Sequence, residues 1–495
     1  MAARVLEDVF VTEGVPEETF IDPPNFNDIY VDVRHPTKPV VIEGPSGTGK
    51  TSTIKKILER LGRSSDAVYL TARSGEDVAM IGLLVDDPSY GIFVIDDFHR
   101  LPAHYQDKLA QIAKLAADES DAKQQKKHPK LVLIGINEVG AKLIEMAADV
   151  AKRCGIHRIE AGRLVDSRAL IAKGASALNV EFSDEDGFHE ESRGDYWLLQ
   201  TLCKQACLAA GVMESKDDKV RITPDFVSIR KKIVDNLANA YLESVKEFCR
   251  GRRFRPSNDP YYRILRFIAT QGESSSVDLV ELANANPSIA GSINNVKDHR
   301  LSVLIQEKPK VGQYLYYNRQ TNRFSVEDPA LFYYLRHLDW DKVRSDCGFR
   351  DAAIQHTWDL AISFAGENRE LAKYVADKLK EMDVSVYFDE DYEVAILGKK
   401  LSDEFETVFG KSAKYVVCFL DKHHRAKIWP TFERDVFARR VEDQAVIPIY
   451  LDDEKFVAIP SDLYGISFKV NRETEPDWRR RANDEIVLKL VDKVA

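Results

Sequence analysis

The sequence predicts a multidomain α/β protein in which two parallel-sheet domains flank a mostly helical middle. With 495 residues, 44% hydrophobic and 30% charged, the chain suits two to four soluble globular domains. The runs PVVIE, GIFVID and LVLIGIN are continuously apolar and alternate with helical stretches, which is typical of parallel strands with helices on both faces. The same alternation returns later in WDLAISFAG, ENRELAKYVADKLKEM and VSVYFDE, which predicts the second α/β domain.

Changes in pattern along the chain predict where one segment ends and the next begins. We expect a first α/β domain with an N-terminal leader over 1–162, a helical lid over 163–255, a winged-helix domain over 256–340, a polar linker over 341–357, and the second α/β domain over 358–495. The winged-helix expectation rests on three helical stretches followed by QYLYYNRQTNRFSV, which predicts two strands around Asn318–Asn322.

Composition argues against several classes of protein. The six cysteines are scattered without paired CxxC motifs, so a zinc site is not expected, and Cys203 and Cys207 are interpreted as core thiols of a helix. No apolar run reaches the about 18 residues of a membrane span, and the N-terminus does not resemble a signal peptide. We therefore expect a cytoplasmic protein with no membrane partner. A net charge of −10 gives no overall attraction to nucleic acid.

The clearest motif is GPSGTGKT, which matches G-x-x-x-x-G-K-[ST] between a predicted strand and a predicted helix. Glycines let backbone N–H groups surround phosphates, the lysine reaches the outer phosphates, and the threonine hydroxyl binds Mg²⁺. The predicted ATP-binding residues of this loop are Gly44, Pro45, Ser46, Gly47, Thr48, Gly49, Lys50, Thr51 and Ser52.

A second motif, GIFVIDDFHRL, follows at the distance expected for a metal-binding strand end. Asp96 is predicted to hold Mg²⁺ together with Thr51, and Asp97 to activate the water that attacks ATP. The alternative is an ordinary strand followed by an aspartate-rich turn. Asn137, at the end of LVLIGIN, could orient the attacking water.

Together these motifs carry a resemblance over 39–240 to P-loop NTPases of the AAA+ or STAND type. The resemblance implies that Asn137 is the sensor 1 residue and that Arg153 is an arginine finger; the alternative for Arg153 is a plain surface arginine. AAA+ motors usually have glutamate where this chain has Asp97. Because aspartate is shorter, we expect slow hydrolysis and a nucleotide-gated switch. The segment 260–338, ending in FSVEDPALFYYLR, is similar to the winged helix that follows such modules.

Five fragments in the last third of the chain, WDLAISFAGENRELA, SVYFDEDYEVAILGKKL, KYVVCFLDKHH, WPTFERDVF and AVIPIYLDD, occur in order. Together they resemble a TIR domain over 356–495, with a flavodoxin-like α/β fold. In TIR domains that cleave NAD⁺, the catalytic glutamate lies four residues after a tryptophan, which implies that Glu433 is catalytic and that Trp429 lies beside it.

The chemistry of NAD⁺ cleavage fits a carboxylate, because nicotinamide is already a cationic leaving group and the ribose becomes positively charged in the transition state. Phe364 and Trp429 are the predicted aromatic contacts to NAD⁺. The alternatives are an acid at a helix start for Glu433, core packing for Phe364 and helix-start packing for Trp429. Asp389 is preferred as a cap of the following loop, over a ribose contact.

The combined resemblance implies a prokaryotic immune effector that oligomerises on a trigger and then depletes NAD⁺. Self-association is expected, with each TIR site completed by the neighbour's loop over 389–400. The trigger is unidentified, and a phage-derived protein and a nucleic acid are both candidates. Two other functions stay open: an ATP-driven TIR scaffold without chemistry, and a nucleic-acid regulator that uses the winged helix and the basic stretch CRGRRFR.

Overall fold

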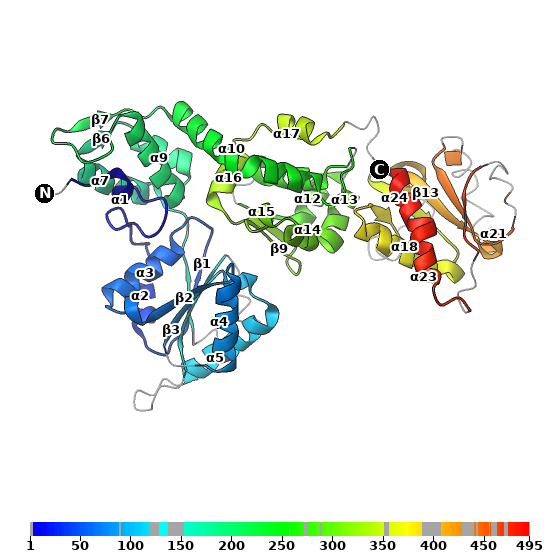
Figure 1. Ribbon diagram of the computed structural model, residues 1–495, viewed down its shortest axis with the longest axis horizontal. Helices are drawn as coiled ribbons and strands as arrows, with labels where there is room; N and C mark the ends of the chain where they lie inside the picture. Colours follow the sequence, from blue (N-terminus) through cyan, green and yellow to red (C-terminus); the bar gives the residue numbers. More distant parts are fainter. Residues whose placement is uncertain are drawn as a thin grey trace. The chain divides into compact units, whose positions relative to one another are not determined.

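The computed structural model forms two compact units (Figure 1). It describes residues 3–88, 91–118, 128–136, 153–256, 258–271, 275–287, 290–350, 356–388, 407–427, 440–441, 444–454, 456, 463–469 and 474–494. Unit 1 comprises Met1–Ala238 and the short segment Glu327–Tyr333, and unit 2 comprises Asn239–Val326 and Tyr334–Ala495. No helix among these residues has the length and apolar character needed to cross a membrane.

Unit 1 is built on a five-stranded parallel sheet of order β2-β3-β4-β1-β5. Its strands are β1 (Val40–Glu43), β2 (Ala67–Thr71), β3 (Ile92–Asp96), β4 (Lys130–Gly135) and β5 (Gly155–Arg158). The apolar runs predicted to be strands are β1, β3 and β4, and β4 is buried along its whole length. The sequence prediction of a parallel sheet is confirmed.

Helices cover both faces of this sheet. Successive strand residues point to opposite sides, and since the strands are continuously apolar, both faces need to be buried. On one face α2 (Phe26–Arg34) and α3 (Lys50–Arg60) pack against a set that includes Val40, Ile42 and Val132. On the other face α4 (Gly75–Asp86) and α5 (Ala103–Asp118) pack against a set that includes Val41 and Leu131.

The second core of unit 1 is mainly helical. It contains α1 (Leu6–Val9), α7 (Leu164–Leu178), α8 (Glu185–Ser192), α9 (Tyr196–Ala209) and the start of α10 (Phe226–Arg250), with a short parallel pair of β6 (Val180–Phe182) and β7 (Val220–Ile222). Cys203 and Cys207 are buried here as predicted. The parallel pair was not predicted from the sequence.

Unit 2 begins with short helices and a three-stranded antiparallel sheet of order β8-β10-β9. Its elements are α11 (Pro260–Gln271), β8 (Ser276–Asp278), α12 (Leu279–Ala285), α13 (Ala290–Asn295), α14 (Leu301–Glu307), α15 (Pro309–Gly312), β9 (Leu315–Asn318), β10 (Arg323–Val326), α16 (Pro329–Arg336) and α17 (Trp340–Cys347). The hairpin turns where expected, while the winged-helix assignment stays a prediction. The segment expected to be a polar linker contains α17, because Trp340, Val343 and Cys347 are buried.

The rest of unit 2 is a second parallel sheet, of order β12-β11-β13-β14-β15. The strands are β11 (Trp358–Ser363), β12 (Val386–Tyr387), β13 (Ala413–Leu420), β14 (Val446–Tyr450) and β15 (Ile466–Ser467). Helices α18 (Arg369–Glu381), α23 (Trp478–Ala482) and α24 (Leu488–Val494) share one core with the sheet, and α21 (Lys422–Lys427) follows β13. The sheet's carboxyl edge is where open α/β sheets place their ligands.

Candidate functional site

The loop between β1 and α3 has the backbone shape of a phosphate-binding loop. Gly47 and Gly49 have φ angles of 79° and 82°, a region that side chains with a Cβ rarely adopt. A Cβ on Gly47 would lie 2.0 Å from Asp195 Oδ2, so the loop also passes too close to the neighbouring carboxylate for any other residue.

Lys50 is folded back onto this loop. Its Nζ donates to the carbonyl oxygens of Gly44 (2.9 Å) and Pro45 (2.6 Å). Burial lowers the pKa of Lys50, against the opposing effect of Asp96 and Asp97. Phosphate oxygens offer the ammonium stronger, charged acceptors than these two carbonyls.

Thr51 and Asp96 form the oxygen pair that the sequence predicted for Mg²⁺. The Thr51 hydroxyl donates to Asp96 Oδ2 at 2.6 Å, and Asp96 Oδ1 accepts the backbone N–H of Asp97 at 2.8 Å. Mg²⁺ prefers such hard oxygen ligands and usually keeps several waters. These two residues therefore fit Mg²⁺, which would neutralise phosphate charge when bound.

Asp97 is held by an arginine that the sequence analysis did not single out. Arg73 donates from Nε to Asp97 Oδ2 (2.6 Å) and from Nη2 to Oδ1 (3.2 Å). Burial alone would raise the pKa of Asp97, but the hydrogen bonds and charge of Arg73 outweigh burial and lower it. The carboxylate is thus ionised, and both of its oxygens are engaged by a cation.

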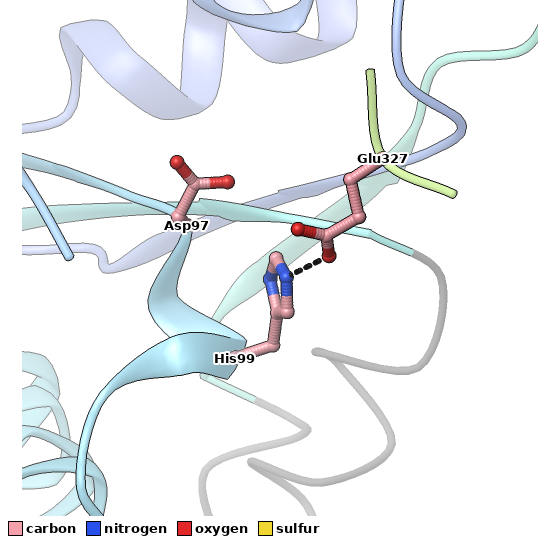
Figure 2. A group of neighbouring side chains, drawn as sticks. All are labelled: Asp97, His99 and Glu327. Atoms are coloured by element: carbon pink, nitrogen blue, oxygen red, sulfur yellow. Dashed lines mark hydrogen bonds and ion pairs between the residues drawn. The ribbon is translucent and has the colours of Figure 1, made fainter. Parts of the chain in front are cut away.

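Glu327 extends this cluster from a distant part of the sequence. Its side chain is only 1% exposed and accepts from His99 Nε2 (2.5 Å), Arg100 Nε (2.6 Å) and Arg73 Nη2 (3.2 Å). Figure 2 shows His99 and Glu327 in contact, with Asp97 beside them. Ligand atoms of these three residues lie within 4.8 Å of one another, as in a metal site. Because two arginines already occupy the carboxylates, the group fits an ion-pair network better than a metal site.

The cluster and the loop enclose a polar cavity of about 260 Å³. The side chains that line it include Ser46, Lys50, Thr51, Arg73, Asp96, Asp97 and Glu327. It holds both positive donors for phosphate and oxygen ligands for Mg²⁺, which is the combination a nucleoside triphosphate needs.

A second cavity, of about 180 Å³, borders the same loop. It shares Gly47, Gly49 and Ser52 with the polar cavity. Most of its lining is apolar and comes from the N-terminal segment and the helical core, for example Phe20, Leu170 and Trp197. A mainly apolar cavity next to a phosphate loop suits a nucleobase.

Two further residues, Asn137 and Arg153, were predicted to act in the NTPase site. Asn137 lies outside the described residues, so its predicted role stays a prediction. Arg153 is described: its side chain is 42% exposed and pairs with Asp118. This position agrees with either of its predicted roles, surface arginine or arginine finger.

In the C-terminal sheet, polar side chains gather where β11 and β13 end. Asp421 accepts from Asn368 Nδ2 (2.8 Å) and from the backbone N–H of His424 (2.7 Å), and His424 Nε2 lies 3.2 Å from Ser363 Oγ. All four residues are buried. Burial lowers the pKa of His424 to about 4, so the imidazole is neutral near pH 7.

Phe364 follows Ser363 and is 9% exposed. Its ring stacks on Phe388 with centroids 5.1 Å apart, and the Arg369 guanidinium lies 5.2 Å from its centroid. These contacts show Phe364 packed within the domain, and its role toward NAD⁺ stays a prediction. Asp389, the loop 389–400, Trp429 and Glu433 lie outside the described residues, so their predicted roles stay predictions.

Residues 360–482 match the family model described as the TIR domain. These residues form a TIR domain. The 3′ cyclic ADP-D-ribose synthase AaTIR of Aquimarina amphilecti is 31% identical over 123 residues, which are 24% of this chain and 37% of that protein. The chain therefore spans little more than a third of that relative's length, and the matched TIR range contains Trp429 and Glu433.

Solved structures match a larger part of the chain than the TIR range, with low TM-scores. The Aeropyrum pernix ORC2 protein in ADPNP–ADP complexes covers 70% of this chain and 98% of its own, with 14% identity and a TM-score of 0.35. The Thermotoga maritima RuvB branch migration motor covers 63% of this chain and 96% of its own, with 17% identity and a TM-score of 0.34.

Proposed function

We propose that this protein is a nucleotide-gated NAD⁺ glycohydrolase. The observation that carries the proposal is that the matched TIR range contains the Trp429–Glu433 spacing of NAD⁺-cleaving TIR domains. A relative named as a cyclic ADP-ribose synthase supports the same chemistry, because making that product from NAD⁺ requires loss of nicotinamide.

In this proposal Glu433 stabilises the positive charge that develops on the ribose as nicotinamide leaves. The neutral His424 and the hydrogen-bonded Asp421 fix the carboxyl ends of β11 and β13. The chain continues from α21 directly into Trp429 and Glu433. This buried polar cluster anchors α21, the last described helix before that segment.

The gate is the P-loop site, which binds ATP with Mg²⁺. Lys50 and the loop amides hold the phosphates, and Thr51 with Asp96 holds the metal. Hydrolysis is slow, for two reasons: Asp97 is shorter than glutamate, and Arg73 occupies both of its carboxylate oxygens. ATP binding, more than hydrolysis, then drives self-association.

Self-association brings TIR domains together in the cytoplasm after a trigger, a phage-derived protein or a nucleic acid, is sensed. NAD⁺ depletion is then an antiviral defence response.

The test is nicotinamide release from NAD⁺ by the purified full chain, with and without ATP and Mg²⁺. Glu433→Gln keeps the shape of the side chain and removes its charge, so release should fall by about 10²–10³-fold while ATP still binds. Lys50→Ala should lose both ATP binding and ATP-dependent release. A Glu433→Gln protein as active as wild type would favour the scaffold function.

A further inference from the structure

A further cavity, of about 660 Å³, lies within unit 2. Residues of α11, α12 and α17 line it, so it joins two segments that are far apart in the chain. Its volume is in the range of small-molecule sites, roughly 300–1,000 Å³. None of its lining residues belongs to the phosphate loop or to the matched TIR range. The cavity is therefore a separate candidate site.

Three arginines give this cavity a positive charge. They are Arg263 and Arg266 on α11 and Arg344 on α17, and their side chains are between 19% and 46% exposed. Among the described residues that line the cavity, the acidic one is Asp341. In a chain whose net charge is −10, a local excess of arginine favours an anionic ligand at this place.

A buried carboxylate holds two of the arginines in position. Asp259 is 4% exposed and accepts from Arg263 Nε at 2.7 Å and from Arg344 Nε at 3.3 Å. It does not itself line the cavity. A guanidinium has five N–H donors, so a bond from Nε leaves further donors for a second acceptor. Because the two side chains are already oriented, a ligand loses less conformational entropy in binding them.

The third arginine has weaker partners. Arg266 Nη1 donates to the Tyr262 hydroxyl at 3.2 Å, and Nη2 lies 3.8 Å from the Asp341 carboxylate. Asp341 is 87% exposed, and ion pairs this open to water contribute little. A phosphate group can accept two parallel hydrogen bonds from one guanidinium. Arg266 can therefore exchange Asp341 for a phosphate at little cost.

We propose that this cavity binds the phosphate groups of a small organic ligand of nucleotide size, through Arg263, Arg266 and Arg344. Phe267 and Leu282 add apolar surface for the organic part. A nucleic acid would need basic residues spread along its backbone, whereas these arginines gather in one cavity beside an aspartate. The site is separate from the proposed ATP and NAD⁺ sites and depends on neither.

The experiment measures dissociation constants by calorimetry, with inorganic pyrophosphate and UDP as probes. The full chain carries Lys50→Ala, so that the phosphate loop does not contribute. Both probes should bind, UDP at least as tightly as pyrophosphate. Adding Arg266→Gln should weaken both by about tenfold, because a charged hydrogen-bond donor is lost. Adding Asp341→Asn should instead strengthen both by about threefold, because a negative charge leaves the lining.

Arg252→Gln is the matched control. Arg252 lies in the same unit and forms an exposed ion pair with Glu307, but it does not line the cavity. This change should leave both affinities as they are. Single-stranded oligothymidylate is the third probe, and it should bind no more tightly than UDP.

Failure of both probes to bind would overturn the proposal, and so would equal effects of Arg266→Gln and Arg252→Gln. Binding of pyrophosphate without UDP would show a site for free inorganic phosphate only, against a ligand of nucleotide size. If oligothymidylate bound more tightly than UDP and lost affinity in Arg266→Gln, the surface would be a nucleic-acid site instead.

Discussion

At the scale of single residues, Asp195 is a titratable group that lies against the phosphate loop. Its side chain caps α9 by accepting the backbone N–H of Leu198 at 2.8 Å, and it lies against Gly47. Burial raises the pKa of Asp195 to about 7. Its charge therefore changes in the physiological range, beside the position expected for phosphates.

We predict that ATP affinity falls as pH rises from 6 to 8. Protonated Asp195 is neutral, whereas above pH 7 its negative charge repels the phosphates. At an effective dielectric constant of about 20 this repulsion is roughly 1–2 kcal/mol, or on the order of tenfold in affinity. Asp195→Asn should still cap the helix and should make the affinity independent of pH over this range.

Titration calorimetry at several pH values would test this. Asp184→Asn is the control, since Asp184 caps α8 in the same way but is exposed and lines neither cavity. It should retain the wild-type pH dependence. A flat profile in wild type would contradict the prediction.

At the scale of elements, the segment Glu327–Tyr333 belongs to unit 1 although the chain on both sides belongs to unit 2. Glu327 fixes the start of this segment through His99, Arg100 and Arg73. Burial alone would raise its pKa, but the hydrogen bond from His99 and the charges of His99 and the arginines outweigh burial and lower it.

We predict that Glu327→Ala destabilises unit 1 by about 3–5 kcal/mol, because it leaves buried cationic groups without their counter-charge. Chemical denaturation would measure the loss. Asp186→Asn is the comparison: it breaks a bidentate pair with Arg168 whose side chains are about half exposed, and should cost less than about 1 kcal/mol. Equal losses would show that the Glu327 cluster contributes little.

The same cluster predicts how stability depends on pH. A carboxyl group whose pKa is lowered on folding stabilises the folded state above its unfolded pKa, and this contribution disappears as pH falls through the lower, folded pKa. Wild type should therefore lose more stability than Glu327→Ala between neutral and acidic pH. Parallel loss in both proteins would contradict this.

At the scale of the whole molecule, the proposed coupling runs from ATP binding to assembly and then to NAD⁺ cleavage. Arg153 is exposed on unit 1, and so is Asp118, with which it forms an ion pair. An exposed arginine can leave such a pair at little cost and reach a phosphate bound by a second subunit.

We predict that Arg153→Ala binds ATP but stays small and inactive after the trigger is added. Asp118→Ala, which removes only the partner of Arg153, should assemble at least as well as wild type. Light scattering beside nicotinamide release would report both properties. A small Arg153→Ala protein with full activity would show that cleavage does not need assembly.

We also predict that Asp97→Asn binds ATP, assembles at least as well as wild type and stays active once triggered. The reason is that the gate depends on binding more than on hydrolysis. Light scattering and nicotinamide release would test this, together with a measurement of ATP turnover. Loss of NAD⁺ cleavage by a fully assembled Asp97→Asn protein would instead make hydrolysis part of the signal.

The sequence by itself determined those features that depend on local pattern. Runs of apolar residues fixed β1, β3 and β4 as buried parallel strands, and GPSGTGKT fixed the loop with Lys50 at its helix start. Five fragments in the right order were enough to predict the TIR domain. In each case the physical signal lies within a few neighbouring residues.

Only the tertiary structure brought together residues far apart in the chain. Glu327 meets His99 across 228 positions, and Gln200 meets Thr19 across 181. No local spacing predicts such pairs, because they depend on how separate helices and strands pack. The helix α17 was not predicted for a related reason. It has few apolar residues, and the burial of Trp340 and Val343 depends on packing against other segments, which the local sequence does not show.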